Sequence, residues 1–301
     1  MKFHRLFPSL FAATALAVFS STAFPNESES LTLLPVEIDP LGADPDTPWT
    51  INIGSLNVRD NPTTADSRRL GSLKRGDEVS GIYLIVKESD EEWLQIDFNG
   101  QPGFISRIGF SRVHPRNLEL MEEHGNLPFG EEIVNRWWGI PLDYEADDLV
   151  EIPEEYRRRS ETRDYRLRRE AMETLAEMID AMRADGLELF VSSPYRSGSL
   201  QTSMFHRRMR NNLAQRGTAP PGHSEHQLGT TADLAPALTD RTLRNSDPQH
   251  AWLKKNGAKY GWRQTYLAEN IEETGYIEEP WHWRYIGREN LAADNDTTEN
   301  D

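Results

Sequence analysis

The stretch GHSEHQLGTTADL, residues 222–234, carries two histidines, a glutamate and an aspartate within thirteen positions. If TTADL forms a strand entered from the preceding loop, His226 lies near the end of the loop and Asp233 lies within the strand. Gly229 permits a sharp change of chain direction between them, because glycine adopts backbone angles that other residues avoid. The sequence therefore allows an imidazole and a carboxylate to converge on one point.

A third side chain of this kind, His282, lies far along the chain in the segment EPWHW. Two histidines and one carboxylate form a catalytic zinc shell, in which the fourth position stays open for water. A histidine and an aspartate at this spacing are also common in capped surface loops, so the spacing alone leaves both interpretations open. Whether the three side chains meet depends on the fold.

Composition excludes several classes of protein. The 301 residues contain no cysteine, which excludes disulfide bonds, cysteine zinc ligands and thiol nucleophiles. With 33 basic and 49 acidic residues the formal net charge is −16, and loss of residues 1–23 would remove two basic residues, giving 31 − 49 = −18. Binding of nucleic acid through bulk charge requires a basic face, so we expect no nucleic-acid partner. An anionic substrate would need a local cationic pocket.

The N-terminus has the layout of a secretory signal peptide over residues 1–23. Lys2 and Arg5 precede the apolar run Leu10–Phe19, and the segment 21–23 offers small residues for cleavage. The run is short for a membrane span, and no later stretch is apolar enough to form one. We therefore expect an exported protein without a membrane span after cleavage; retention of the segment as an anchor is the alternative.

Residues 48–113 show short alternating runs broken by turn residues, with Asn99-Gly100 as a strong hairpin signal. Four features of this region resemble bacterial SH3 domains: LNVRDNP (56–62), the pattern G-x-L-x-x-G-D (71–77), Trp93 and NGQPGFI (99–105). The resemblance implies a small all-β barrel, and members of that family commonly bind cell-wall peptide or act as spacers. In the simpler interpretation, the apolar residues of these segments only fill a small core.

The second half of the chain alternates between helical and strand-like patterns. Apolar residues at spacings of three and four predict a helix over 164–184, and a second helix is expected over about 199–216. Asp247-Pro248 suits the start of a third helix, as cap and first-turn residue. Strands are expected at LELFVSS (187–193) and near TGYIEEPWHWRYIG (274–287). With no glycine-rich phosphate loop and no repeated βαβ period, this order predicts an α+β fold.

Three motifs of this half resemble VanY-type D-alanyl-D-alanine carboxypeptidases and occur in the order expected of that family. They are SPYRS-x-x-x-Q (193–201), S-x-H-x-x-G-x-x-x-D (224–233) and EPWHWRYIG (279–287). The segment PLDYEADDLVEIPEEYR (141–157) also looks like the entry segment of the family. The resemblance covers about residues 135–290 and implies a hedgehog/DD-peptidase-like zinc peptidase fold.

The resemblance implies a role for each matching side chain. His226, Asp233 and His282 would be the ligands of Zn2+, Glu279 would be the catalytic base, and Arg196 would contact the substrate or the developing oxyanion. The residue types suit these roles, because zinc makes hydroxide available from bound water near neutral pH. A carboxylate can accept the proton of that water and return it to the leaving amine. A guanidinium fork pairs well with a carboxylate or an oxyanion.

Neighbouring residues are open to more than one interpretation. Gln201 is expected on the substrate side of the site, and Ser224 is expected to orient the loop or to hydrogen-bond the substrate. His223 is expected on the substrate side or behind a ligand, although it could instead be a ligand itself. Glu278 competes with Glu279 for the role of base, but only Glu279 falls in the EPWH pattern.

Two features depart from the family pattern. Thr231 stands where the family usually has alanine, and it adds a hydroxyl beside Asp233. The segment WRQTYLAENIEE (262–273) also diverges. If that segment lines the substrate groove, the resemblance leaves the substrate preference open.

The chain thus divides into six expected parts. They are a signal peptide (1–23), a flexible linker (24–47), a bacterial SH3-like domain (48–113), a connector (114–134), a VanY-like peptidase domain (135–290) and an acidic disordered tail (291–301). The resemblance implies a bacterial zinc carboxypeptidase of the periplasm, cell wall or exterior, which removes the C-terminal D-alanine from peptidoglycan stem peptides. The alternatives are an L,D-carboxypeptidase or endopeptidase of the same fold, and a non-catalytic cell-wall-binding protein.

Overall fold

The computed structural model describes residues 31–35, 47–158, 164–238 and 241–290, and the described part from Thr32 onward belongs to one unit. The expected signal peptide, most of the expected linker and the expected acidic tail lie outside the described residues. Within the described ranges, no helix is long and apolar enough to cross a membrane.

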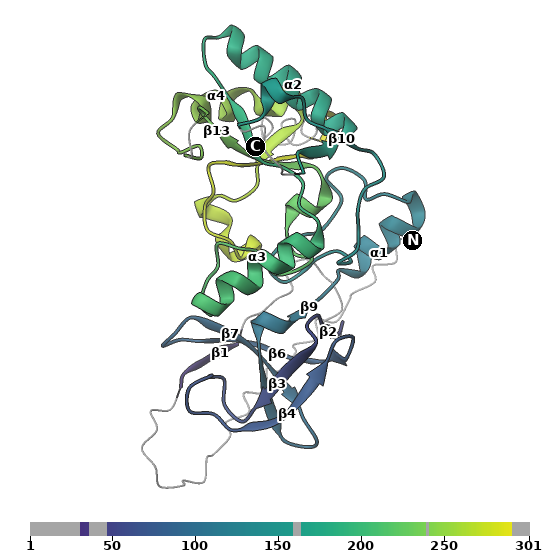
Figure 1. The fold of residues 1–301 in the computed structure, drawn as a ribbon, viewed down its shortest axis with the longest axis vertical. Coiled ribbons are helices and arrows are strands. Elements are labelled where there is room, and N and C mark those ends of the chain that lie inside the picture. The colour runs from purple at the N-terminus through teal and green to yellow at the C-terminus, as the bar shows by residue number, and fades with distance from the viewer. Residues whose placement is uncertain (1–30, 36–46, 159–163, 239–240, 291–301) are drawn as a thin grey trace, which may run out of the picture. The chain divides into compact units, whose positions relative to one another are not determined.

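Residues 49–111, called the β-sheet unit below, fold into antiparallel strands (Figure 1). One sheet, which β1 joins, has the order β1-β6-β7-β8-β3-β4, and the other has the order β5-β2-β9. The elements are β1 (Leu33–Pro35), β2 (Trp49–Ile51), β3 (Ser55–Arg59), β4 (Arg69–Lys74), β5 (Glu78–Val79), β6 (Gly81–Val86), β7 (Glu91–Asp97), β8 (Pro102–Ser106), the 3-10 turn η1 (Arg107–Gly109) and β9 (Phe110–Ser111). Both sheets are open among the described residues, so the predicted closed SH3-like barrel is not confirmed and stays a prediction.

Two local features of the β-sheet unit follow from backbone hydrogen bonding. The hairpin signal at Asn99-Gly100 is confirmed, because both residues have positive φ angles, 56° and 79°, between β7 and β8. Leu33–Pro35, which falls inside the expected flexible linker, instead pairs antiparallel with β6. The edge of a sheet offers unpaired N–H and C=O groups, and this short strand satisfies them.

Residues that follow the β-sheet unit complete its core. Trp137 and Trp138 pack into the same apolar cluster as Trp49. The buried guanidinium of Arg136 pairs with the buried carboxylate of Glu92 in β7, with Nε 2.6 Å from Oε1. The expected peptidase region and the β-sheet unit therefore share a core and a buried ion pair.

The second half of the chain is organised around a four-stranded antiparallel sheet with the order β12-β13-β15-β14. Its strands are β12 (Phe190–Ser193), β13 (Thr231–Ala235), β14 (Trp262–Gln264) and β15 (His282–Tyr285), while β10 (Leu149–Glu151) and β11 (Arg166–Arg168) form a separate pair. The helices are α1 (Pro115–His124), α2 (Arg169–Ala184), α3 (Gly198–Asn211), α4 (Pro248–Asn256) and α5 (Ile271–Thr274), with the 3-10 turns η2 (Glu154–Tyr156), η3 (Glu225–Leu228), η4 (Gly257–Tyr260) and η5 (Ala268–Asn270).

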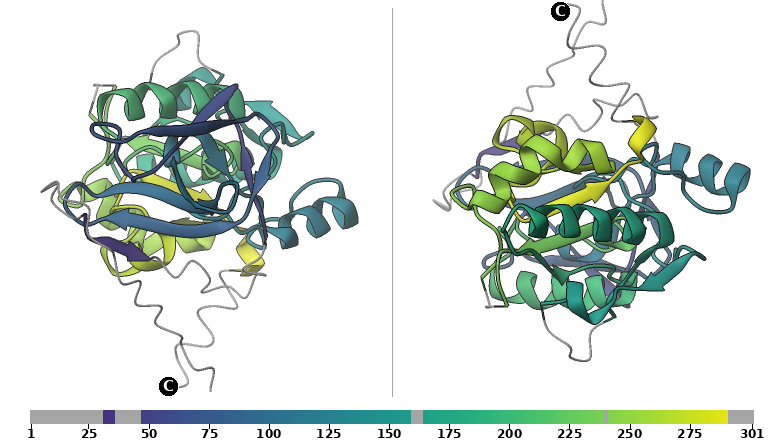
Figure 2. Two further views of the ribbon diagram at one scale, coloured as in Figure 1. Left: turned by 90° about the horizontal axis from the view of Figure 1, so that it is seen from below. Right: turned by 90° about the horizontal axis from the view of Figure 1, so that it is seen from above.

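Helix α2 covers one face of this sheet (Figures 1 and 2). Its apolar stripe, which includes Met178 and Met182, packs against Leu234 of β13 and Tyr285 of β15. Burial of that face leaves the other face of β13 and β15 for polar side chains, because neighbouring residues of a strand point to opposite sides.

The predicted elements of this half are largely confirmed, with shifts at their ends. Helix α2 begins at Arg169 rather than at 164, because residues 166–168 pair with β10 as β11. Helix α3 ends at Asn211, before the expected 216. Asn211 is followed by a second asparagine, and asparagine has a low helix propensity. Helix α4 starts at Pro248 after the cap residue Asp247, as expected. Antiparallel strands combined with separate helices agree with the predicted α+β class.

Candidate active site

Two neighbouring strands bring an aspartate and a histidine side by side. In the ladder between β13 and β15, Asp233 lies directly opposite His282. The adjacent residues Leu234 and Trp283 are buried in the core beneath α2, so the two polar side chains lie on the other face of the sheet. The pairing of β13 with β15 thus joins positions that are distant in the sequence.

His226 reaches the same point from η3, just before β13. Gly229 ends this turn with a φ of +73°, which reverses the chain direction as its sequence position predicts. A Cβ atom on Gly229 would lie 2.6 Å from Leu149 Cδ2, the end of a flexible side chain that could shift, so the backbone angle is the main reason for glycine here. The left-handed turn therefore holds His226 above the start of β13.

The three expected ligands converge. His226, Asp233 and His282 each offer one ligand atom, and these atoms lie within 4.8 Å of one another. Asp233 Oδ1 lies 3.3 Å from His226 Nε2 and 3.3 Å from His282 Nδ1. Both imidazoles are almost fully buried, while 15% of the Asp233 side chain is exposed. This constellation excludes the capped-loop interpretation for His226 and Asp233.

The donor set fits zinc. His226 Nε2 and Asp233 Oδ1 are buried without a hydrogen bond of good geometry to any described residue, as expected of atoms that face a cation. The opposite ring nitrogens are engaged: His226 Nδ1 lies 2.7 Å from the carbonyl of Pro194, and His282 Nε2 lies 2.7 Å from Glu225 Oε2. These contacts select the tautomers that leave His226 Nε2 and His282 Nδ1 as donors to a metal.

Burial and charge shift the pKa values of the three ligands in different directions. Burial, aided by the charge of Arg196, lowers the pKa of His226 to about 4. Burial opposes the charged form of His282 as well, but hydrogen bonds to Asp233 and Glu225 outweigh it and raise its pKa to about 9. The pKa of Asp233 is lowered despite its burial, because both imidazoles favour the carboxylate. Asp233 is therefore ionised over the neutral range, and a metal ion that binds here would displace the proton of His282.

Glu279 lies at the edge of this cluster. Its Oε2 is 3.6 Å from His282 Nδ1, and the backbone N–H of His282 donates to the Glu279 carbonyl at 3.1 Å. Pro280 restricts the turn between them, so the carboxylate and the ligand keep a fixed relation. Burial raises the pKa of Glu279 to about 7, where a carboxylate exchanges protons readily at neutral pH. The competing Glu278 is not among the residues that line the pocket.

Arg196 is a positively charged side chain in the wall of the pocket, and Gln201 holds it in position. Arg196 Nη1 donates to Gln201 Oε1 at 3.1 Å, and its backbone N–H donates to the carbonyl of His226 at 3.1 Å. Gln201 is itself buried and donates to the carbonyl of Ala219 at 2.6 Å. Gln201 was expected on the substrate side; the structure places it behind Arg196, which lines the pocket.

Ser224 and two tyrosines complete the pocket wall. Ser224 lines the pocket, as expected of a substrate-side residue. Tyr266 stacks on the His282 ring with centroids 4.3 Å apart, and Tyr276 packs 4.9 Å from Tyr266. Tyr266 belongs to the divergent segment 262–273, which therefore does reach the pocket. Sequence reasoning missed both tyrosines, because an aromatic residue near a motif does not reveal which way it points.

The expectation for His223 is wrong. Its ring is fully buried and does not line the pocket. His223 Nε2 accepts from the backbone N–H of Arg112 at 3.2 Å, and Nδ1 lies 3.0 Å from the carbonyl of Asn135. His223 therefore ties the ligand loop to the end of the β-sheet unit, and its ring is neither a ligand nor a substrate contact. The sequence could not show the direction of the His223 ring. His223 is adjacent to Ser224, but adjacent residues of an irregular loop can point in unrelated directions.

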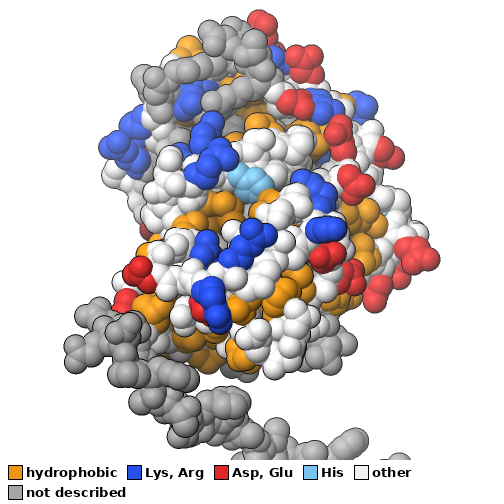
Figure 3. Space-filling model, turned by 60° about the horizontal axis from the view of Figure 1, so that its bottom comes forward, with side chains coloured by type: hydrophobic (Ala, Val, Ile, Leu, Met, Phe, Trp, Pro, Cys, Tyr) orange, Lys and Arg blue, Asp and Glu red, His pale blue; other side chains and the backbone are white. Residues whose placement is uncertain are grey.

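The surroundings of the site are less acidic than the chain as a whole. Figure 3 shows one face on which Lys and Arg side chains gather, with acidic side chains toward the edges. The segment 198–217, which contains α3 and ends at the pocket, holds the arginines Arg207, Arg208, Arg210 and Arg216 and no acidic residue. Within the pocket itself, Arg196 is the permanently charged cation that could meet an anionic substrate.

The comparisons with known proteins agree with this geometry. A family model described as VanY, D-alanyl-D-alanine carboxypeptidase, matches residues 164–288. The chain is 32% identical over 174 residues to YodJ of Bacillus subtilis (strain 168), assigned as a carboxypeptidase, which covers 55% of this chain and 64% of the relative. It is 31% identical over 169 residues to a D-alanyl-D-alanine carboxypeptidase of Enterococcus faecalis (strain ATCC 700802 / V583), which covers 52% of this chain and 58% of the relative. The chain thus spans about six-tenths of these two relatives.

A solved structure is similar over a comparable share of the chain. The LdcB LD-carboxypeptidase matches with 32% identity and a TM-score of 0.51, over 55% of this chain and 80% of that one. The fold is similar to that of the LdcB LD-carboxypeptidase, and the cluster of two histidines and one aspartate has the donor set of a catalytic zinc site. Through residues 164–288, the chain belongs to the VanY family of D-alanyl-D-alanine carboxypeptidases.

Proposed function

We propose that this protein is an exported zinc carboxypeptidase that removes the C-terminal D-alanine from peptidoglycan stem peptides. One observation supports this function above all: three ligand atoms converge within 4.8 Å beside the buried carboxylate of Glu279. Zinc held there supplies Lewis acidity, which makes a water nucleophilic near neutral pH. Similarity to the Enterococcus faecalis D-alanyl-D-alanine carboxypeptidase supports the choice of substrate.

Different side chains of the pocket act in different steps of the hydrolysis. A Glu279 carboxylate oxygen accepts the proton of the attacking water and then returns it to the nitrogen of the leaving D-alanine. The Arg196 guanidinium, held by Gln201, pairs with the terminal carboxylate or with the oxyanion that develops on the scissile carbonyl. Tyr266 and Tyr276 form a wall beside the ligands and limit the access of water.

A second candidate is L,D cleavage of the tetrapeptide stem. It is favoured by the similarity to the LdcB LD-carboxypeptidase, which has the same level of identity as the curated relatives. Both reactions use the same ligands, base and arginine. They differ in the configuration of the residue on the amino side of the scissile bond.

Mass analysis of defined muropeptides tests the proposal. The protein is incubated with pentapeptide and tetrapeptide stems, with and without a chelator. Loss of one alanine from the pentapeptide, abolished by the chelator and restored by zinc, is the expected result. Trimming of the tetrapeptide alone would assign the L,D reaction. No cleavage of either stem by the zinc-loaded protein would favour a non-catalytic cell-wall-binding protein.

Export and the role of the β-sheet unit are further parts of this proposal. The charged, apolar and small-residue segments within 1–23 support a location outside the cytoplasm. The resemblance of residues 48–113 to bacterial SH3 domains supports a role of the β-sheet unit in contact with the wall. Fractionation of cells that produce the full chain tests export, with recovery only in the cytoplasm as the contrary outcome.

A further inference from the structure

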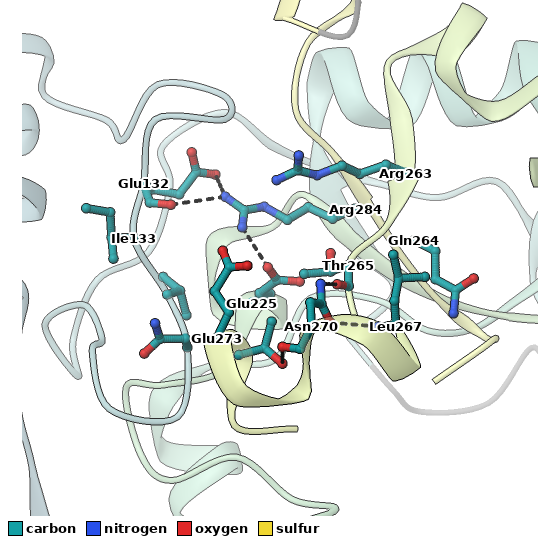
Figure 4. A pocket seen from close by; sticks show the side chains of 13 residues that line it. Glu132, Ile133, Glu225, Arg263, Gln264, Thr265, Leu267, Asn270, Glu273 and Arg284 are labelled. Carbon is teal, nitrogen blue, oxygen red and sulfur yellow. Dashed lines mark hydrogen bonds and ion pairs between the residues drawn. The ribbon is translucent and has the colours of Figure 1, made fainter. Parts of the chain in front are cut away.

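A chain of buried charged side chains leads away from the ligand His282. Its Nε2, on the side opposite Asp233, lies 2.7 Å from Glu225 Oε2. The other oxygen of Glu225, Oε1, accepts from Arg284 Nη1 at 2.6 Å, and Arg284 Nη2 lies 2.7 Å from Glu132 Oε1. The side chains of Glu225, Arg284 and Glu132 are at most 5% exposed. Figure 4 shows the Arg284 guanidinium between the two carboxylates.

The two ligand histidines are supported unequally. His226 Nδ1 faces a neutral backbone carbonyl, that of Pro194, whereas His282 Nε2 faces a carboxylate. A carboxylate behind a ligand histidine fixes the tautomer and makes the ligand nitrogen a stronger donor to the metal. The other oxygen of Glu225 lies 2.6 Å from Arg284 Nη1, so the carboxylate behind His282 is paired with a permanently charged guanidinium.

The position of Glu225 requires a carboxylate and not an amide. Its two oxygens accept from two different donors, the imidazole N–H of His282 and the guanidinium of Arg284. A glutamine could turn its single oxygen toward only one of them and would direct its NH2 group at the other. One buried donor would then be left without an acceptor.

Glu132 prevents Arg284 from leaving this arrangement. Arg284 borders a cavity of about 370 Å³, lined also by Glu132, Glu225, Arg263 and Glu273, into which its side chain could turn (Figure 4). The ion pair with Glu132 holds the guanidinium against Glu225 instead. Arg284 itself follows His282 by two residues on β15, so both side chains leave the same face of the strand.

We propose that Glu225 is a positioning residue that orients His282 for zinc, and that Arg284 and Glu132 keep Glu225 in place. Glu132 lies outside residues 164–288, so the metal site depends on a segment that precedes the VanY domain. The inference rests on the proposed zinc function, but it concerns metal binding and not the choice of substrate. None of the three residues needs to touch the substrate.

Zinc affinity, measured by competition with a chelating indicator, tests the proposal on the full chain. Glu225→Gln should weaken zinc binding about 10- to 100-fold, the usual effect of removing such a support. Glu132→Gln should weaken it by a smaller factor, because an amide oxygen can still accept from Arg284. The visible spectrum of the cobalt-substituted protein should change in Glu225→Gln, since the orientation of His282 changes.

Glu92→Gln is the matched control. It also removes a buried carboxylate from an arginine, Arg136, but Glu92 lies in β7, which contributes no residue to the ligand cluster or to the pocket beside it. Its zinc affinity should stay within about twofold of the unmodified protein, because distant sites act independently. Glu225→Gln with unchanged affinity, or a loss in Glu92→Gln as large as in Glu225→Gln, would overturn the proposal.

If Glu225→Gln does not fold, the zinc affinities of Glu132→Gln and of the control Glu92→Gln test the proposal instead. Equal zinc affinities in these two variants would then overturn it. The readout is independent of hydrolysis. A protein that binds zinc as expected but cleaves no stem peptide would refute the proposed substrate and leave this inference standing.

Discussion

Two carboxylates close to His282, those of Asp233 and Glu279, acquire opposite properties from their surroundings. Burial raises the pKa of Glu279 to about 7, whereas the imidazoles on either side of Asp233 lower its pKa despite burial. Asp233 is therefore suited to hold a cation, and Glu279 is suited to exchange a proton. Environment assigns the roles of ligand and base to two chemically similar side chains.

Glu279→Gln separates these roles. The amide keeps the shape of the side chain but cannot accept a proton, so kcat should fall at least about a hundredfold, within the range attributed to general bases. Zinc content, measured by elemental analysis, should stay at one ion per chain, because the three ligands are intact. Near-normal kcat in this variant would remove Glu279 from the mechanism.

His226→Ala, unlike Glu279→Gln, should change the zinc content as well as the activity. Loss of one of three ligands opens the site, so both zinc content and activity should be lost together. Circular dichroism should show that the fold persists, since strands β13 and β15 pair through their backbones. A variant that kept stoichiometric zinc would show that His226 is not a ligand.

At the scale of elements, the site depends on how η3 enters β13. Gly229 adopts a φ of +73°, and the strand begins two residues later with Asp233 on the face of the metal site. A single turn thus sets both the position of His226 and the register of Asp233 opposite His282.

Gly229→Ala should disturb stability and metal binding together. The left-handed angle costs a residue with a Cβ about 1–2 kcal/mol, and the new methyl group would collide with Leu149. Denaturant unfolding should show this loss, and zinc titration should show weaker binding. Gly76→Ala, at a φ of +87° with open space around it, provides a control that shares the backbone strain without the contact with the ligand loop. Equal zinc affinity in the two variants would contradict the role of Gly229 in the site.

At the scale of the whole molecule, the β-sheet unit and the peptidase region are joined through buried groups. Arg136 pairs with Glu92, and Arg112, just after β9, donates from its backbone to His223 beside the ligand loop. Arg112 also places its guanidinium 3.4 Å from the ring centre of Trp138. These contacts make the β-sheet unit a structural support of the peptidase region.

The Glu92–Arg136 pair predicts a pH-dependent contribution to stability. Burial opposes ionisation of Glu92, but the charge of Arg136 outweighs it and lowers the pKa of Glu92 below the ordinary 4.5. The pair therefore stabilises the fold above about pH 4.5, and the contribution is lost as the pH falls toward the lower pKa of the folded protein. Glu92→Gln should lower the free energy of unfolding by about 3–5 kcal/mol at pH 7, since it leaves a buried arginine unpaired.

Denaturant unfolding of both proteins at pH 7 and pH 3.5 checks this sign. The difference in unfolding free energy between the unmodified protein and Glu92→Gln should shrink at the lower pH. A difference of the same size at both values would show that the charge of Glu92 does not stabilise the fold.

The sequence by itself determined the local features of this protein. The left-handed turn at Gly229, the hairpin at Asn99-Gly100 and the amphipathic helix α2 follow from side-chain and backbone preferences over a few residues. The three residues that the structure brings together, His226, Asp233 and His282, could also be named from the sequence, through the resemblance of their motifs to the VanY family.

Only the tertiary structure decided which of the remaining residues serve the site. His223 and Glu225 lie on either side of Ser224, yet the ring of His223 is held by Arg112 and Asn135, whereas the carboxylate of Glu225 lies against His282. Sheet pairing and the packing of distant segments set these directions, and neither produces a regular pattern of residues in the sequence. Local rules act along the sequence, whereas the direction of a buried side chain depends on partners that lie far away in it.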